Sequence, residues 1–384
     1  FIFYTLLLNA QESYPVEWDV VANIREEGFQ RSEIANTLSY MTDVLGARLT
    51  NSEDMRRAQD WAVKEMQRIG LNNIEIEPFM DYGVSWDNTF FSLHMIEPDY
   101  QTMVGYPIAH TPGINGRQKL EVVRIDIKTK ADLDKYRGQL RGKAVLASPQ
   151  VPIDQNRYRD GVKRYTEEQL KDISEKPLPK SPRGPRGPAN PELVGSEERN
   201  AFFKAEGVAV ILESRSGWIA AVRGFARPGA KKDKLDRKET LDHLPLVAVT
   251  PEHYNRMVRI AERNIPIKID IEIQTKIGRK RRQARNVLGE IEGADLKDQD
   301  VMLGAHFDTW HASPNASDNT SGVAVMLEAM RILKAVGVKP RRTIRIALWS
   351  GEEQGIHGSR EYVNKHFGNT NNHNVGKKSG YDRF

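Results

Sequence analysis

The sequence predicts an α/β protein in which one layered domain carries an inserted, β-rich module. Three observations support this prediction. Residues 267–384 alternate strand-like and helix-like segments, and residues 31–70 show helical periodicity twice. From about residue 118 to 266, by contrast, short apolar runs are separated by loops. With 384 residues, the chain is long enough for two or three domains.

Two helices are expected near the N-terminus, within residues 32–46 and 52–70. Their apolar residues recur at spacings of three and four, which places them on one helical face. Ser52 is a suitable N-cap for the second helix, and Gly70 is a suitable C-cap. The next two stretches are typical of strands: 73–79 and 88–98.

The middle of the chain has a different character. It contains the short apolar runs "LEVVRIDI", "GKAVLAS", "GVAVILES" and "LPLVAVT". Residues 177–191 hold six prolines, which fix φ and remove backbone donors, so an extended loop is expected there. We therefore expect an insert over 118–266, and a layered domain formed by 17–117 together with 267–384.

In the last third of the chain, three strands are expected over 286–293, 300–308 and 341–350. Two helices are expected over 319–337 and 355–367. In α/β sheets, ligands bind beyond the carboxyl ends of strands. His306 and Asp308 lie at one such end, and Glu352 and Glu353 follow another. Carboxylates are rarely buried unless they are paired or metal-bound, so these strand ends indicate a site.

The residue types at these strand ends suit a metal centre. His306 and Asp308, two apart on a strand, point to the same side, so the carboxylate can orient the histidine as a metal ligand. Asp318 begins a predicted helix, and of the adjacent Glu352 and Glu353 one can hold a metal while the other acts as a base. Taken singly, an H-x-D pair is weak, Asp318 is more often a helix N-cap, and a Glu-Glu pair is usually a solvated face. Their combination on consecutive strand ends favours a metal site.

Composition excludes some classes of protein. The chain has no cysteine, so a metal must be held by His, Asp and Glu, and no disulfide exists. No apolar run reaches 18 residues, so no membrane span is expected. The net charge of +5 does not indicate nucleic-acid binding, and the basic run 276–285 is expected to be a solvated strand edge. Residues 1–10 are typical of the end of a secretory signal peptide, with a buried strand as the alternative, so we expect a secreted or periplasmic protein.

The motifs "GAHFDTW", "SDNTSG" and "RTIRIALWSGEEQGIHGSREY" resemble the co-catalytic zinc exopeptidases of the bacterial leucyl aminopeptidase and plasma glutamate carboxypeptidase type. The segments "GARLTNSEDMRRAQDW" and "RNVLGEIEG" agree with this resemblance, which covers about residues 17–117 and 267–368. The middle resembles a protease-associated domain more weakly. The resemblance implies a three-layer α/β sandwich with a mixed, mostly parallel central sheet.

The resemblance also implies a role for each residue of the site. His306 would bind one of two zinc ions, Asp318 would bridge both, and Glu353 would bind the other. Glu352 would be the general base that takes a proton from a metal-bridging water, which attacks the peptide carbonyl. Asp308 would orient His306, and the Asp318–Asn319 peptide bond would be cis.

The sequence departs from the family pattern in its last ligands. The family needs a further Asp and a late His, and Asp382, His366 and His373 match neither position well. We therefore expect the remaining ligands to lie beyond Phe384, the chain to be truncated at both ends, and this fragment alone to be inactive.

Two other functions were compared with a secreted exopeptidase of the aminopeptidase or carboxypeptidase type. One is a glutaminyl-cyclase-like acyl transferase that uses a single zinc. The other is a non-catalytic binding ectodomain of the same fold, which the retained site residues disfavour. Trp310 and His311 are weak candidates for contacts with the peptide substrate. Side-chain preference, the terminus attacked and the oligomeric state are not predicted.

Overall fold

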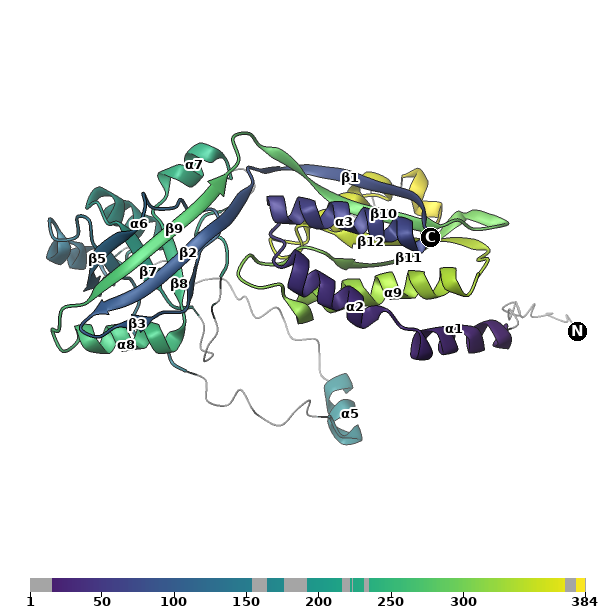
Figure 1. Cartoon of the computed structure of the whole chain (residues 1–384), viewed down its shortest axis with the longest axis horizontal. Helices are drawn as coiled ribbons and strands as arrows, with labels where there is room; N and C mark the ends of the chain where they lie inside the picture. The colour runs from purple at the N-terminus through teal and green to yellow at the C-terminus, as the bar shows by residue number, and fades with distance from the viewer. Residues whose placement is uncertain are drawn as a thin grey trace, which may run out of the picture.

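The chain folds around two β-sheets that lie side by side (Figure 1). The structure is a computed structural model that describes residues 16–153, 164–175, 192–215, 222, 224–230, 235–369 and 378–383. The expected signal segment 1–10 and the proline-rich stretch 177–191 lie outside these described residues.

The smaller sheet has four strands in the order β1 (Asn72–Gly83), β10 (Arg282–Ile291), β12 (Arg342–Trp349) and β11 (Leu296–His306). The pairs β1–β10 and β10–β12 are antiparallel, whereas β11 and β12 run parallel. The sheet is therefore mixed, as expected. Its described part is less parallel than "mostly parallel" implies, because β10 pairs antiparallel with both of its neighbours, β1 and β12.

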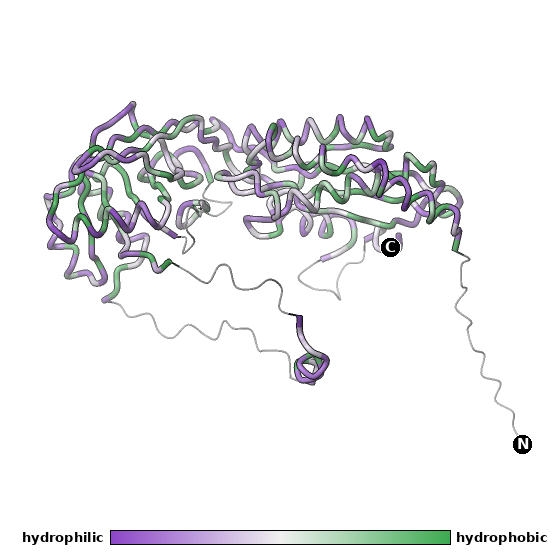
Figure 2. Tube along the Cα trace, turned by 60° about the horizontal axis from the view of Figure 1, so that its bottom comes forward, coloured by the Kyte–Doolittle hydropathy of each residue, from purple (hydrophilic) through white to green (hydrophobic). Residues whose placement is uncertain are grey.

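Helices cover both faces of this sheet and confirm the three-layer arrangement. On one face, α3 (Glu53–Ile69) and α9 (Ser321–Ala335) bury an apolar cluster against the strands. On the other face, α10 (His357–His366) packs Tyr362 against the sheet. The caps of α3 agree with the sequence: Ser52 accepts from the Met55 N–H, and Gly70 has the left-handed conformation. Figure 2 shows how hydrophobic and hydrophilic segments alternate along these helices.

The larger sheet has eight strands in the order β3-β2-β9-β5-β6-β7-β8-β4. Their bounds are β2 (Trp86–Glu97), β3 (Gln101–Thr102), β4 (Gly105–Pro107), β5 (Gln118–Arg124), β6 (Ala144–Leu146), β7 (Val210–Glu213), β8 (Leu246–Val249) and β9 (Lys268–Ile277). The sheet extends beyond the expected insert 118–266, because β2, β3, β4 and β9 also belong to it. The long antiparallel pairing of β2 with β9 makes these flanking segments part of the larger sheet.

The remaining helices are α1 (Trp18–Gln30), α2 (Ile34–Ser39), η1 (Tyr40–Leu45), α4 (Lys130–Leu133), η2 (Asp134–Tyr136), α5 (Glu167–Glu175), α6 (Ser196–Ala205), α7 (Arg237–Asp242), α8 (Pro251–Ala261), η5 (Ala316–Thr320) and η6 (Ser379–Arg383). The expected helix within 32–46 is thus an α-helix that continues as one π-helical turn. Within the described part of the chain, none of the helices has the length and apolar character needed to cross a bilayer.

The chain crosses between the two sheets twice, at adjacent points. Gly83, at the end of β1, pairs with Arg282, at the start of β10. Gly83 has a φ of 122°, and a Cβ atom there would lie 2.5 Å from the carbonyl oxygen of Leu235, so only glycine fits. Figure 1 shows both crossings as one narrow two-stranded connection.

The basic run 276–285 lies at this crossing and is not a free sheet edge. Most of the run is exposed, as expected, but β10 begins within it and lies between β1 and β12, so the expectation that it is a sheet edge is wrong. Arg281 forms an ion pair with Asp81, and Arg282 forms one with Glu53.

Candidate metal centre

The parallel pairing of β11 and β12 brings two polar strand ends together. His306, the last residue of β11, lies in register with Trp349, the last residue of β12. The loops that continue from these residues carry Asp308 on one side, and Glu352 and Glu353 on the other. Parallel strands present their carboxyl ends at one sheet edge, so the site follows from the topology.

His306 lies at the centre of the cluster and is 9% exposed. Its Nδ1 is 3.0 Å from the backbone carbonyl oxygen of Asp308, to which it donates. Its Nε2 is 3.0 Å from Asp318 Oδ1 and 3.8 Å from Glu352 Oε2. Burial lowers the pKa of His306, but the charge of Asp308 and the contacts with Asp318 and Glu352 outweigh it and raise the pKa.

Asp308 is fully buried, and its carboxylate acts mainly on the backbone of the neighbouring loop. Its Oδ1 accepts from the N–H of Glu352 at 3.2 Å, and its Oδ2 accepts from the N–H of Glu353 at 3.3 Å. The nearest contact of this carboxylate with His306 Nδ1 is 3.8 Å, longer than the bond to the backbone carbonyl. Asp308 thus orients His306 through its main chain, and its side chain holds the glutamate loop.

Asp318 lies in the π-helical turn that precedes α9, and its side chain is 78% exposed. The Asp318–Asn319 peptide bond is cis, which confirms the expectation from the resemblance. Asp318 is not an ordinary N-cap, because α9 begins at Ser321 and is preceded by Thr320. Its carboxylate is therefore available at the surface of the site, beside the His306 ring.

The two glutamates differ in their surroundings. Glu352 is partly exposed, with 38% of its side chain accessible, and reaches toward His306. Burial, followed by the charges of Asp308 and Asp318, raises the pKa of Glu353 to about 7. A carboxyl group held among other carboxylates in this way favours a nearby cation.

Arg48 and Thr50 join the segments of this site, although neither was predicted from the sequence. Arg48 is completely buried and donates to the Phe307 carbonyl oxygen at 2.8 Å and to Thr320 Oγ1 at 2.6 Å. Burial lowers the pKa of Arg48 to about 10, and the charge of Asp308 opposes this shift. Both residues lie in the "GARLTNS" stretch, where a charged residue just before a helix cap was the available signal.

Trp310 and His311, the candidate substrate contacts, touch the larger-sheet unit. His311 is 6% exposed, with Nε2 2.6 Å from the Pro107 carbonyl oxygen, and its ring lies edge-on to Trp86. Trp310 packs edge-on against Phe225. A contact of either side chain with substrate remains a prediction.

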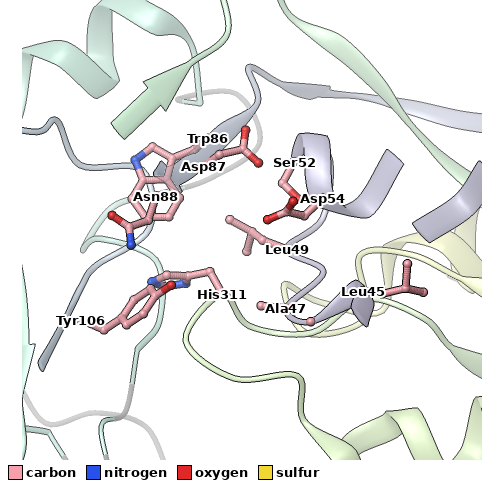
Figure 3. A pocket seen from close by; sticks show the side chains of 11 residues that line it. Leu45, Ala47, Leu49, Ser52, Asp54, Trp86, Asp87, Asn88, Tyr106 and His311 are labelled. Atoms are coloured by element: carbon pink, nitrogen blue, oxygen red, sulfur yellow. The ribbon is translucent and has the colours of Figure 1, made fainter. Parts of the chain in front are cut away.

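A cavity of about 210 Å³ lies beside His311 (Figure 3). It is lined by Leu45, Gly46, Ala47, Leu49, Ser52, Asp54, Trp86, Asp87, Asn88, Tyr106 and His311. None of the expected metal ligands lines this cavity. Leu49 and Ser52 face it, whereas Arg48 and Thr50, between and beside them, bond to the Asp308 loop.

Of the rejected ligand candidates, His366 does not join the cluster. His366 Nε2 lies 2.7 Å from Glu77 Oε1, on the α10 face of the sheet. His373 and the side chain of Asp382 lie outside the described residues.

The donor set at the two strand ends suits zinc, which takes imidazole nitrogen and carboxylate oxygen. The backbone bond of Nδ1 leaves Nε2 of His306 as the nitrogen that would face the metal. Asp308, Asp318, Glu352 and Glu353 gather negative charge that a divalent cation would balance. Across the described ranges, no three His, Asp or Glu side chains already form a complete ligand set.

Comparisons with known proteins agree with this geometry. Residues 286–376 match the model of "Peptidase family M28". Carboxypeptidase Q of Pongo abelii is 23% identical over 373 residues, which cover 95% of this chain and 68% of that protein. Carboxypeptidase Q of Xenopus laevis is 31% identical over 129 residues, 34% of this chain and 27% of that protein.

Among solved structures, a peptidase M28 precursor from Shewanella amazonensis shares the fold. The TM-score is 0.55 at 21% identity, over 91% of this chain and 70% of that one. The matched span 286–376 contains every expected metal-site residue, from His306 to Glu353. Residues 286–376 are therefore similar to peptidase family M28, and the comparisons support a metallopeptidase of the co-catalytic zinc exopeptidase type.

Proposed function

We propose that this chain carries the catalytic residues of a two-zinc exopeptidase. His306 and Glu353 would each bind one ion, Asp318 would bridge both, and Glu352 would be the general base. The observation that carries the proposal is the position of His306 Nε2, 3.0 Å from Asp318 Oδ1 and 3.8 Å from Glu352 Oε2. The pairing of β11 with β12 brings His306 close to Glu352, and Asp318 reaches them from the turn before α9.

Zinc in such a site supplies Lewis-acid polarisation of the peptide carbonyl and lowers the pKa of water. The protein residues then handle the proton. Glu352, partly exposed and beside His306, takes the proton from the attacking water and passes it to the leaving amine. Asp308 keeps the Glu352 backbone in place through the 3.2 Å bond to its N–H.

We further propose a division into a peptidase domain, residues 17–117 and 267–384, and a protease-associated-like insert, residues 118–266. The parallel strands β5, β6, β7 and β8 lie within the insert. The insert would complete its sheet with β2 and β9 from the flanking segments.

Secretion or export to a periplasm is also part of the proposal. Its support is the apolar segment "FIFYTLLLNA" and the lack of cysteine. Fractionation of cells that express the complete gene, with and without this segment, tests it. Retention of both forms in the cytoplasm would contradict export.

A substrate panel on the protein from the complete gene tests the proposed activity. It should contain aminoacyl anilides, dipeptides with free C-termini, and N-terminal glutaminyl peptides, together with a zinc analysis. We expect two zinc ions per chain and hydrolysis of anilides or dipeptides. One zinc with cyclisation of the glutaminyl peptides would favour the acyl transferase instead, and no turnover with any substrate would favour the binding ectodomain.

A further inference from the structure

Thr50 lies two residues before the cap of α3, yet it is part of the strand-end site. Its side chain is 2% exposed, and it is separated by about 250 to 300 residues from the loops that it contacts. Neither the general base nor the expected ligands include it. The contribution of this buried hydroxyl group therefore depends on its hydrogen-bond partners.

The Thr50 hydroxyl uses both of its hydrogen-bonding capacities on the site. It donates to Asp308 Oδ2 at 3.0 Å and accepts from the N–H of Gly351 at 3.1 Å. The next two N–H groups, those of Glu352 and Glu353, go to the same Asp308 carboxylate. Three consecutive N–H groups thus converge on the pair Thr50–Asp308, an arrangement of backbone donors that binds anionic groups.

The loop is sharply turned at this point. Gly351, just before Glu352, has a φ of 75°, in the left-handed region that favours glycine. The bonds from Glu352 and Glu353 to Asp308 are 3.2 and 3.3 Å long, so they are weak by themselves. The Thr50 hydroxyl restricts the conformations of this loop, because it holds both the Asp308 carboxylate and the Gly351 N–H.

We propose that Thr50 is a positioning residue, which sets the Glu352–Glu353 loop against His306 through its hydroxyl group. This inference rests on the proposed function. It requires only the hydroxyl, so removal of the hydroxyl should impair turnover and zinc binding more than it impairs folding.

The test uses Thr50→Val, Thr50→Ser and Thr50→Ala in the protein expressed from its complete gene. The matched control is Thr343→Val. Thr343 is 3% exposed, donates to the Lys297 carbonyl oxygen at 2.8 Å and accepts from the Gly293 N–H at 3.2 Å. It makes the same kind of bonds at the opposite end of β12, away from the site.

We expect Thr50→Val to lower kcat about tenfold or more, to weaken zinc binding about tenfold, and to leave KM within about threefold. Hydrogen exchange of the peptide that contains Gly351 should become faster. Thr50→Ser should restore kcat, and Thr343→Val should keep it, although its Tm falls as well. If Thr50→Val does not fold, the comparison of Thr50→Ser with Thr50→Ala isolates the effect of the hydroxyl group, because neither variant carries the methyl group of threonine.

Equal kcat and zinc affinity in Thr50→Val and Thr343→Val would overturn the inference. So would a Thr50→Ser variant that is as impaired as Thr50→Val or Thr50→Ala. Glu352→Gln separates this failure from failure of the proposed function. If Glu352→Gln is inactive while Thr50→Val is normal, only the role of Thr50 is wrong; if Glu352→Gln is fully active, the proposed mechanism itself is wrong.

Discussion

The carboxylate of Asp308 accepts a hydrogen bond from the backbone N–H of Glu352, 3.2 Å away and 44 residues later in the sequence. One strand end thereby fixes the main chain of the next. The side chain that emerges from that main chain is the proposed general base. The site is thus held by backbone contacts as much as by contacts between its side chains.

Asp308→Asn should loosen this arrangement. An amide has one acceptor oxygen, so one of the three donors to the carboxylate would face an NH₂ group. We expect a loss of about 1–3 kcal/mol in the free energy of unfolding and about tenfold weaker zinc binding. Denaturant unfolding and a zinc titration measure both. Asp298→Asn, at an exposed position of β11, the strand that precedes Asp308, is the control and should change neither.

Glu352→Gln should separate zinc binding from turnover. The amide keeps the size of the side chain but cannot take a proton from water. Because general-base catalysis contributes about 10²–10⁴-fold, kcat should fall by that factor while the zinc content stays the same. Turnover near the wild-type level would exclude Glu352 as the base.

His306→Ala should weaken zinc binding, because it removes the proposed nitrogen ligand at the centre of the cluster. In the unsubstituted protein, a chelator should abolish activity and lower Tm, and added zinc should restore both. A ligand at 100 times its Kd stabilises a folded protein by about 2.7 kcal/mol, so the Tm shift should be easily measured. His94→Ala, on β2, should respond to chelator and zinc as the unsubstituted protein does.

Asp87 should make stability depend on pH. Burial raises the pKa of this carboxyl group to about 6, although its Oδ1 accepts from the Glu53 N–H at 2.9 Å. Between the ordinary pKa of Asp and about 6, the folded state binds more protons than the unfolded state, so stability falls as pH rises through this window. Relative to Asp87→Asn, the protein should lose roughly 2–3 kcal/mol between pH 4 and pH 7. Unfolding of both forms across this range is the measurement, and a constant difference would contradict it.

Local signals in the sequence predicted the layered part of the fold well. The spacing of apolar residues and the caps Ser52 and Gly70 located α3, because both signals depend only on nearby residues. The polar residues after β11 and β12 indicated the site, because parallel strands share an edge.

Long-range pairing accounts for what the sequence did not predict. The membership of β2 and β9 in the larger sheet depends on their pairing with each other across about 180 residues. The contributions of Arg48 and Thr50 depend on where the chain before α3 meets two distant loops. The periodicity and spacing of residues in the sequence do not indicate such long-range contacts, and only the folded structure shows them.

The pairing of Gly83 with Arg282 has a consequence for how such a protein can evolve. The chain leaves the four-stranded sheet and returns to it between two neighbouring residues, so a short hairpin there would close the same β1–β10 ladder. A gene segment that encodes the larger-sheet unit can therefore be gained or lost at this position without a change in the order of the four strands of the smaller sheet. The bond from His311 to the Pro107 carbonyl oxygen shows that the loop after His306 also contacts this larger-sheet unit, so loss of the unit would leave the His311 ring without this partner.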